Sequence, residues 1–137
     1  MNGGAPVRML SGDAKNPIWS PAGDLIVYAG RFVDGQVPLF GARPDGTRAD
    51  SPAVRVREGG YRFLPYGRGL VYLERLRSVD FSLLDLATGD RRPLNRLEDR
   101  GRLQTFDLTP DGKTIVFDRS QERSDIVLIE RPLTTAC

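Results

Sequence analysis

Histidine is absent from this chain of 137 residues, and cysteine occurs once, as the last residue, Cys137. Without histidine, catalytic sites of the Ser-His-Asp and Cys-His types are excluded, and so are metal sites with histidine ligands. A single cysteine cannot form a disulfide within the chain, so it indicates no redox compartment. A general acid or base would have to be a carboxylate or a lysine with a perturbed pKa.

A one-sided charge and long apolar runs are also lacking. The 20 Lys and Arg face 18 Asp and Glu, and the arginines form no stripe with interleaved aromatics, so we expect no nucleic-acid partner. No segment approaches the ~18 apolar residues of a membrane span, and residues 1–6 lack the apolar run of a signal peptide. Read as a complete chain, the sequence predicts a cytoplasmic protein. Read as part of a longer secreted or membrane-anchored protein, it is compatible with an extracytoplasmic location.

The chain is rich in glycine and proline, and it contains an internal repeat. Its 15 glycines and 10 prolines divide it into short segments, which favours β-strands over a helical bundle. In each repeat a bulky apolar residue is followed by proline after two residues, glycine after two more, and an apolar run. The prolines lie 44 (65 − 21) and 45 (110 − 65) residues apart. The aligned segments are residues 19–28, 63–72 and 108–117.

Each Pro-x-Gly predicts a tight hairpin, because proline fixes φ and glycine supplies a positive φ. The apolar run after it predicts a strand buried on both faces. A polar loop and a third strand follow, and in the first two periods a fourth strand rich in arginine. The third strands are expected at 37–42, 79–86 and 125–130, and the fourth at 48–57, with a break, and at 91–94.

These strands predict an all-β chain of three four-stranded units, at about 16–57, 60–95 and 103–132. Residues 7–10 read as an additional strand, because they precede the first hairpin as residues 91–94 precede the third. The chain thus opens with a fourth-type strand and ends without one.

The hairpin segments carry a specific resemblance. Trp19-Ser20-Pro21-Ala22-Gly23 and Leu108-Thr109-Pro110-Asp111-Gly112-Lys113 resemble the WSPDGK hairpin of TolB-type β-propeller repeats, which are relatives of the WD-type propellers. The second repeat lacks the Asp before glycine. The resemblance implies four-stranded blades around a channel, a rigid platform for protein partners, and closure by a strand from the other chain end.

Three blades cannot close a ring, since propellers have ~4–8. One hypothesis is a homodimer, in which two chains form a six-bladed ring and residues 7–10 of each complete the last blade of the other. The other hypothesis is that a longer polypeptide supplies the remaining blades.

Five arginines in the loops between second and third strands form a candidate partner-binding rim, because a ring of guanidinium groups suits carboxylates or phosphates. Acidic residues lie among them, so local ion pairs on a solvated rim are the alternative that the sequence favours. The candidate rim residues are Arg31, Arg75, Arg77, Arg119 and Arg123.

Two other residue sets are interpreted structurally. The aromatics Trp19, Phe63 and Phe106 are expected to anchor strands in the core. Single aspartates in the turns, at 24, 45 and 111, are expected to form Asx-turns, because a Ca²⁺ site needs ~6–8 converging oxygens.

The expected function is that of a non-catalytic scaffold for a protein or peptide, without metal or cofactor. The alternative is a regulatory or substrate-gating propeller fragment of a larger enzyme or receptor, such as a peptidase or kinase. A hydrolase or lyase built from channel-facing carboxylates is the form that an enzyme would take. Because fold does not fix function, these expectations depend on the resemblance.

Overall fold

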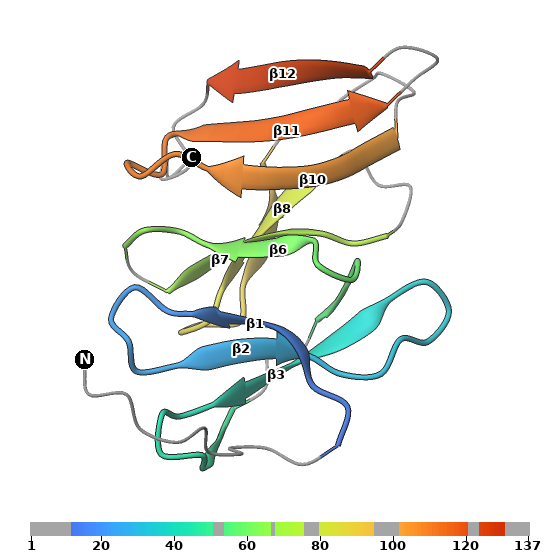
Figure 1. Cartoon of the computed structure of the whole chain (residues 1–137). Coiled ribbons are helices and arrows are strands. Elements are labelled where there is room, and N and C mark those ends of the chain that lie inside the picture. Colours follow the sequence, from blue (N-terminus) through green and yellow to red (C-terminus); the bar gives the residue numbers. More distant parts are fainter. Residues whose placement is uncertain are drawn as a thin grey trace, which may run out of the picture.

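The computed structural model describes residues 12–50, 54–66, 68–75, 80–94, 102–120 and 124–130, of which 102, 119, 120, 124 and 125 are placed by backbone alone. The described residues form twelve strands in three antiparallel sheets, which lie one above another (Figure 1). They contain no helix, and so none that could cross a membrane. The predicted all-β class is confirmed.

The first sheet contains β1 (Lys15–Trp19), β2 (Ile26–Ala29), β3 (Val37–Ala42), β4 (Arg48–Ala49) and β5 (Arg55–Val56). Its first four strands are neighbours in chain order, and both β4 and β5 pair with β3. The fourth position of this sheet is therefore filled by two short pieces. The predicted break between residues 48 and 57 is confirmed.

The second sheet is a meander of four strands in the order β6-β7-β8-β9. They are β6 (Tyr61–Phe63), β7 (Gly69–Leu73), β8 (Phe81–Asp85) and β9 (Arg91–Pro93). The order of these elements agrees with the prediction: a hairpin of two strands, a loop with a third strand, and a fourth strand rich in arginine.

In its described residues, the third sheet agrees with the expectation that the chain ends without a fourth-type strand. These residues form three strands, β10 (Arg102–Leu108), β11 (Thr114–Ser120) and β12 (Ser124–Glu130). The strand expected at residues 7–10 lies outside the described residues.

The Pro-x-Gly hairpins are confirmed at the first and third repeats. Gly23 and Gly112 have φ of 73° and 70°, in the left-handed region that favours glycine. Their N–H groups donate to the carbonyls of Ser20 (2.9 Å) and Thr109 (2.8 Å). In Figure 1 the turns β1–β2, β6–β7 and β10–β11 all lie on the left side, which we call the turn side.

The middle sheet is buried on both faces, because successive side chains of a strand point to opposite faces. Leu70 and Tyr72 pack toward the first sheet, whereas Val71 and Leu73 pack toward the third. All four side chains are at most 1% exposed. The two cores between the sheets thus make the three sheets one stack.

The three sheets also point the same way along the stack. The equivalent residues Tyr72 and Phe117 of the second and third repeats both face the preceding sheet. Tyr28, their equivalent in the first repeat, lies outside the core between the first and second sheets, to which its neighbours Val27 and Ala29 belong. Equivalent positions of the three described sheets therefore face the same direction along the stack.

The expectation that Trp19 is a core anchor is wrong, because its side chain is 57% exposed. Its equivalents Phe63 and Leu108 pack against the core on the preceding side of their sheets. Trp19 pairs with Ile26 and so points away from the second sheet, where the described residues place no preceding sheet. Phe106, 3% exposed, is a core residue as expected, and Phe63 is half-buried.

Candidate functional site

The predicted arginine rim is described only in part. Arg31 is exposed and forms an ion pair with Asp13, with Nε and Oδ2 3.2 Å apart; Asp13 precedes the first strand and is not one of the acidic residues of the rim loops. Arg75 is also exposed, while Arg77 and Arg123 lie outside the described residues. The loops that carry Arg31 and Arg75 are adjacent, since the side-chain amide of Gln36 donates to the Glu74 carbonyl (2.7 Å).

The placement of Arg119 in a loop is wrong. Strand β11 continues through Arg119, which pairs with Leu103 on one side and Asp125 on the other. The expected loop began at Arg119, but the pairing between β11 and β12 continues to the end of β11 at Ser120. Only the backbone of Arg119 is described.

The Asx-turns predicted for the turn aspartates are confirmed at two positions. Asp45 accepts from the N–H of Thr47 (2.9 Å), and Asp111 accepts from the N–H of Lys113 (3.0 Å). Hydrogen bonds from the Thr47 and Thr109 hydroxyls lower the pKa of Asp45 and Asp111, respectively. Hydrogen bonds within the turns therefore account for the positions of these two carboxylates.

Asp24 is held differently. It accepts from the Ser20 hydroxyl (2.8 Å), and its other oxygen accepts from the Arg68 guanidinium (2.7 Å). The Ser20 hydrogen bond is the main cause of the lowered pKa of Asp24, and Arg68 adds to it. Asp24 thus connects the first turn to the second sheet.

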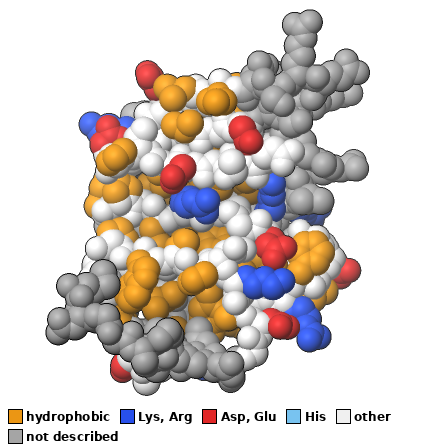
Figure 2. Space-filling model, viewed as in Figure 1, with side chains coloured by type: hydrophobic (Ala, Val, Ile, Leu, Met, Phe, Trp, Pro, Cys, Tyr) orange, Lys and Arg blue, Asp and Glu red, His pale blue; other side chains and the backbone are white. Residues whose placement is uncertain are grey.

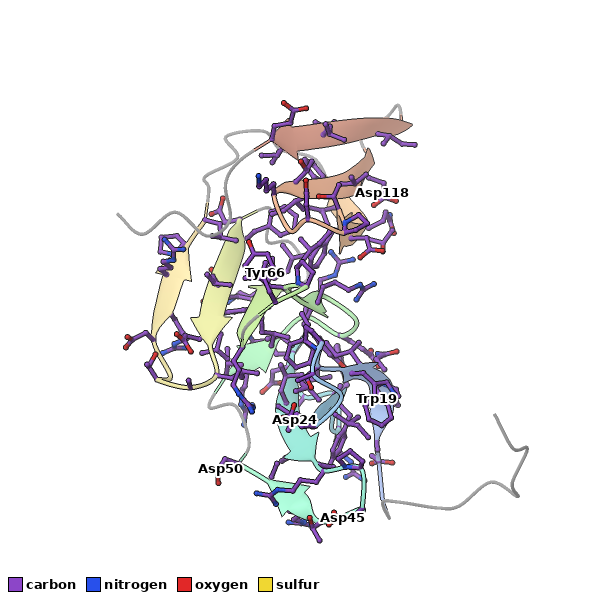
Figure 3. All side chains as sticks on the ribbon, turned by 90° about the vertical axis from the view of Figure 1, so that its left-hand side faces the viewer. Trp19, Asp24, Asp45, Asp50, Tyr66 and Asp118 are labelled. Atoms are coloured by element: carbon purple, nitrogen blue, oxygen red, sulfur yellow. The ribbon has the colours of Figure 1, made fainter. Side chains whose placement is uncertain are left out.

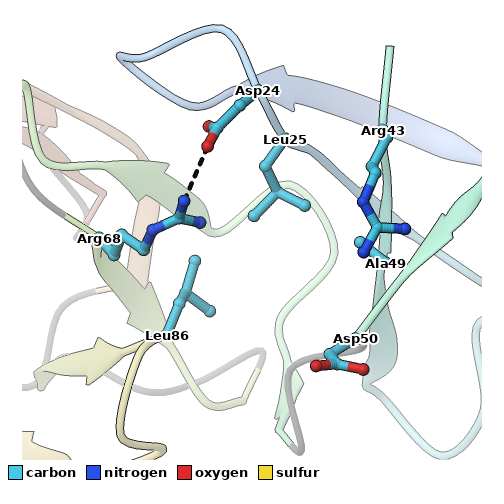
Figure 4. Close-up of a pocket in the computed structure, with 7 residues that line it drawn as sticks. All are labelled: Asp24, Leu25, Arg43, Ala49, Asp50, Arg68 and Leu86. Atoms are coloured by element: carbon cyan, nitrogen blue, oxygen red, sulfur yellow. Dashed lines mark hydrogen bonds and ion pairs between the residues drawn. The ribbon is translucent and has the colours of Figure 1, made fainter. Parts of the chain in front are cut away.

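A cavity of about 270 Å³ opens beside this ion pair, between the first and second sheets. We call it the turn-side cavity, because the first turn, the β3–β4 turn and the ends of β7 and β8 surround it (Figure 4). Apolar side chains line it together with two arginines and two aspartates. The lining residues are Asp24, Leu25, Arg43, Ala49, Asp50, Arg68 and Leu86.

The four charged side chains around the cavity differ in how many of their hydrogen-bonding groups have partners. Asp24 and Arg68 satisfy each other at one side (Figure 4). On the other side Arg43 uses one N–H on the Arg48 carbonyl (2.6 Å), which leaves further guanidinium donors, since Arg has five. Asp50 makes no hydrogen bond or ion pair within the described part of the chain. The cavity therefore offers both a cation and a carboxylate to a ligand.

Sequence reasoning missed this cavity, although one signal was present. Asp24 and Arg68 are 44 residues apart, which is the repeat spacing, so they occupy the same position in successive repeats. Opposite charges at equivalent positions of stacked repeats predict an ion pair. Arg43 and Asp50 carry no such signal, because they come from a turn and from the short strand region that follows it.

Each end of the stack presents exposed apolar side chains. At one end lie Trp19 (57% exposed) and Phe40 (37%), with Phe40 against the Tyr28 ring at a centroid distance of 5.7 Å. At the other end lie Ile126 (82%) and Leu128 (54%). We call these surfaces the Trp19 face and the Ile126 face.

Figure 2 shows hydrophobic side chains over the third sheet, at the upper end of the molecule, and over the first sheet below. From the turn side, Figure 3 shows Tyr66 near the middle of the stack, Asp24 lower, at the level of the first sheet, and Trp19 at one side of that sheet. The apolar ends and the polar cavity are therefore separate surfaces.

Within the described ranges, no group of three or more acidic or cysteine side chains is placed to hold a metal ion. Comparison of the sequence with family models and with curated proteins gives no match in either case.

Proposed function

We propose that this chain is a protein- or peptide-binding scaffold built as part of a β-propeller of TolB-like type. The observation that carries the proposal is the stack itself, in which a middle sheet is buried on both faces and every sheet points the same way. Propeller blades require this arrangement, because each blade packs on a neighbour on either side. The hairpin repeat at a spacing of 44 and 45 residues agrees with it.

The turn-side cavity is the proposed binding place. Drug-sized ligands occupy pockets of ~300–1,000 Å³. A cavity of about 270 Å³ instead suits one side chain or chain end of a partner. The guanidinium of Arg43 suits a carboxylate through a forked hydrogen bond, and Leu25 and Leu86 supply apolar contact. We therefore expect an acidic side chain or a C-terminal carboxylate in the bound segment.

The test is selection of displayed peptides on the purified chain, followed by fluorescence anisotropy with selected peptides. Arg43→Gln is expected to weaken binding about tenfold or more, as loss of a central charged contact does. Arg31→Gln, on the opposite rim, is the matched control and should leave affinity unchanged. If Arg31→Gln and Arg75→Gln weaken binding while Arg43→Gln does not, the arginine rim is the binding surface and the cavity is not.

The proposed scaffold is non-catalytic, because histidine is absent and the turn carboxylates that are engaged have structural partners. Incubation of the selected peptides with the chain, followed by mass spectrometry, tests this. Intact peptides are expected. Cleavage that persists through repeated purification and is lost in a carboxylate variant such as Asp50→Asn would contradict the proposal.

One observation favours a second candidate function, that of a gating or regulatory propeller segment within a larger enzyme or receptor. Both ends of the stack present apolar side chains, which further sheets of the same polypeptide could cover. The natural reading frame discriminates between the candidates, since further repeats or a catalytic domain in it would favour the second.

A further inference from the structure

We propose that the Trp19 face of one chain packs on the Ile126 face of a second copy, so that two chains close one ring of six sheets. The inference rests on the proposed propeller arrangement, and it names the occupant of the two apolar ends.

The Trp19 face is equivalent to the side by which the second and third sheets each contact the sheet before them. In the second and third sheets, Phe63 and Leu108 are partly buried and pack against the core that faces the preceding sheet. Trp19 is their equivalent, and it lacks such a neighbour among the described residues. We call the side of a sheet that faces the sheet before it in the chain its preceding-side face. The Trp19 face is thus the preceding-side face of the first sheet, and no described sheet lies against it.

The Ile126 face is equivalent to the side by which the first and second sheets each contact the sheet after them. In the first and second sheets, Val27 and Val71 point to the sheet that follows and are fully buried. Their equivalent Val116 points outward with its cross-strand partner Leu128, and Asp118 does so with Ile126. The Ile126 face therefore has the orientation of the faces that, twice within this chain, contact a preceding-side face.

Two such faces match each other and not themselves, so association is head to tail. Head-to-tail contacts form a closed ring where the rotation permits, and an open filament otherwise. One copy supplies three sheets and three copies supply nine, both outside the ~4–8 blades of propellers. Two copies supply six, so we commit to two.

The edge of β12 away from β11, which carries no strand among the described residues, supports the same partner. In the first and second sheets, the third strand carries a further strand on that edge, β4 and β5 beside β3, and β9 beside β8. Each of these outer strands directly precedes the first strand of the next sheet. By the same order, the strand that fills this edge of β12 is expected from the second copy, whose Trp19 face meets the Ile126 face.

The chain offers a direct probe, because Trp19 is its one tryptophan. Light scattering after size exclusion should give twice the 15.2 kDa chain mass. On dilution the Trp19 emission should shift to the red as the mass falls to one chain. A constant mass of one chain, a mass of three or more, or filaments would overturn the proposal.

The variants Ile126→Arg and Leu128→Arg test the order of the faces. Both side chains are at least half exposed, so the fold should survive, as far-UV circular dichroism can verify. Each variant should weaken association about tenfold or more and red-shift Trp19, although Trp19 lies at the other end of the same chain. The control is Val33→Arg, in the β2–β3 loop, which should change neither reading. An equal loss in the control would overturn the assignment.

Mixing distinguishes head-to-tail from face-to-same-face contact. Trp19→Arg alone and Ile126→Arg alone should both remain single chains, whereas their mixture should form a heterodimer through its one intact pair of faces. No heterodimer overturns the inference. Loss of the dimer with peptide binding retained counts against this inference alone, whereas a stable dimer that binds no peptide counts against the proposed function alone.

Discussion

Asp24 and Arg68 hold the same position in two successive repeats, and their side chains meet across the first and second sheets at 2.7 Å. The pair is half exposed, at 49% and 52%, so solvent screens it and its contribution to stability is small. Its interest lies in the order it reveals. An acidic residue of one repeat and a basic residue of the next fix the relative position of two neighbouring turns.

Ser20→Ala and Arg68→Ala should each raise the pKa of Asp24 toward the ordinary value of 3.8. The Ser20 hydrogen bond is the largest single cause of the lowered pKa, and Arg68 adds both its charge and a hydrogen bond. Carboxyl carbon shifts followed by NMR during a pH titration measure this. An unchanged pKa in Ser20→Ala would contradict the assigned cause.

The same group has a consequence for acid stability. Because its pKa is lower in the folded chain, Asp24 stabilises the fold above pH 3.8, and this contribution is lost as the pH falls through the folded-state pKa. Ser20→Ala should therefore flatten the loss of stability on acidification. Urea unfolding at pH 6 and below pH 3 would compare the two chains.

Gly112→Ala should destabilise the fold more than Gly23→Ala, although both glycines have nearly the same backbone conformation. A Cβ at Gly23 meets open space, so only the left-handed backbone cost of about 1–2 kcal/mol applies. A Cβ at Gly112 would lie 2.8 Å from Pro65 Cδ and 3.2 Å from Tyr66 Cε1, which should add about 1–3 kcal/mol. Urea unfolding of both variants gives the difference, and equal losses would contradict the close packing of the second and third turns.

Tyr61→Phe should lower stability at neutral pH and raise tolerance of alkali. The Tyr61 hydroxyl donates to the Asn16 carbonyl (2.6 Å), and losing this bond should cost about 0.5–1.5 kcal/mol. Burial raises the pKa of Tyr61 from 10.0 to about 12, so the neutral form is favoured in the folded chain. Stability should thus decline as the pH rises from 10 toward 12, and Tyr61→Phe should remove this decline. Unfolding free energies at pH 7 and pH 11 measure both effects.

Arg57→Met should weaken the attachment of the third sheet. The Arg57 guanidinium donates to the carbonyls of Leu103 and Gln104 (2.7 Å to the latter), where β10 has an irregular register. Loss of charged hydrogen bonds predicts a cost of about 1.5–3 kcal/mol. Arg55→Met, at an exposed position two residues away, is the control and should stay within about 0.5 kcal/mol. Faster amide exchange confined to β10–β12 would identify the third sheet as the affected part.

Local chemistry explains what the sequence could predict. The hairpins at Pro21 and Pro110 follow from the φ preferences of two residue types, and the strand predicted at 37–42 coincides with β3. Contacts across repeats could not be predicted in this way. Arg57 reaches carbonyls 46 and 47 residues away, and the turn-side cavity needs two sheets in place.

Trp19 shows a different limit of sequence reasoning. A bulky residue before a hairpin was expected in a core, and at Phe63 and Leu108 a core is present. Whether such a residue is buried depends on a neighbouring sheet rather than on its own sequence. The repeat pattern therefore predicts the face on which Trp19 lies, but not its exposure.

Sheets that all point the same way have a consequence for the history of such a chain. Duplication of one repeat adds a unit that already carries both of the surfaces it needs, one for each neighbour. The length of the stack can then change by whole repeats without the invention of a new contact. Equivalent positions can still carry different residues, as Asp24 and Arg68 do, and such a difference can join neighbouring repeats by an ion pair.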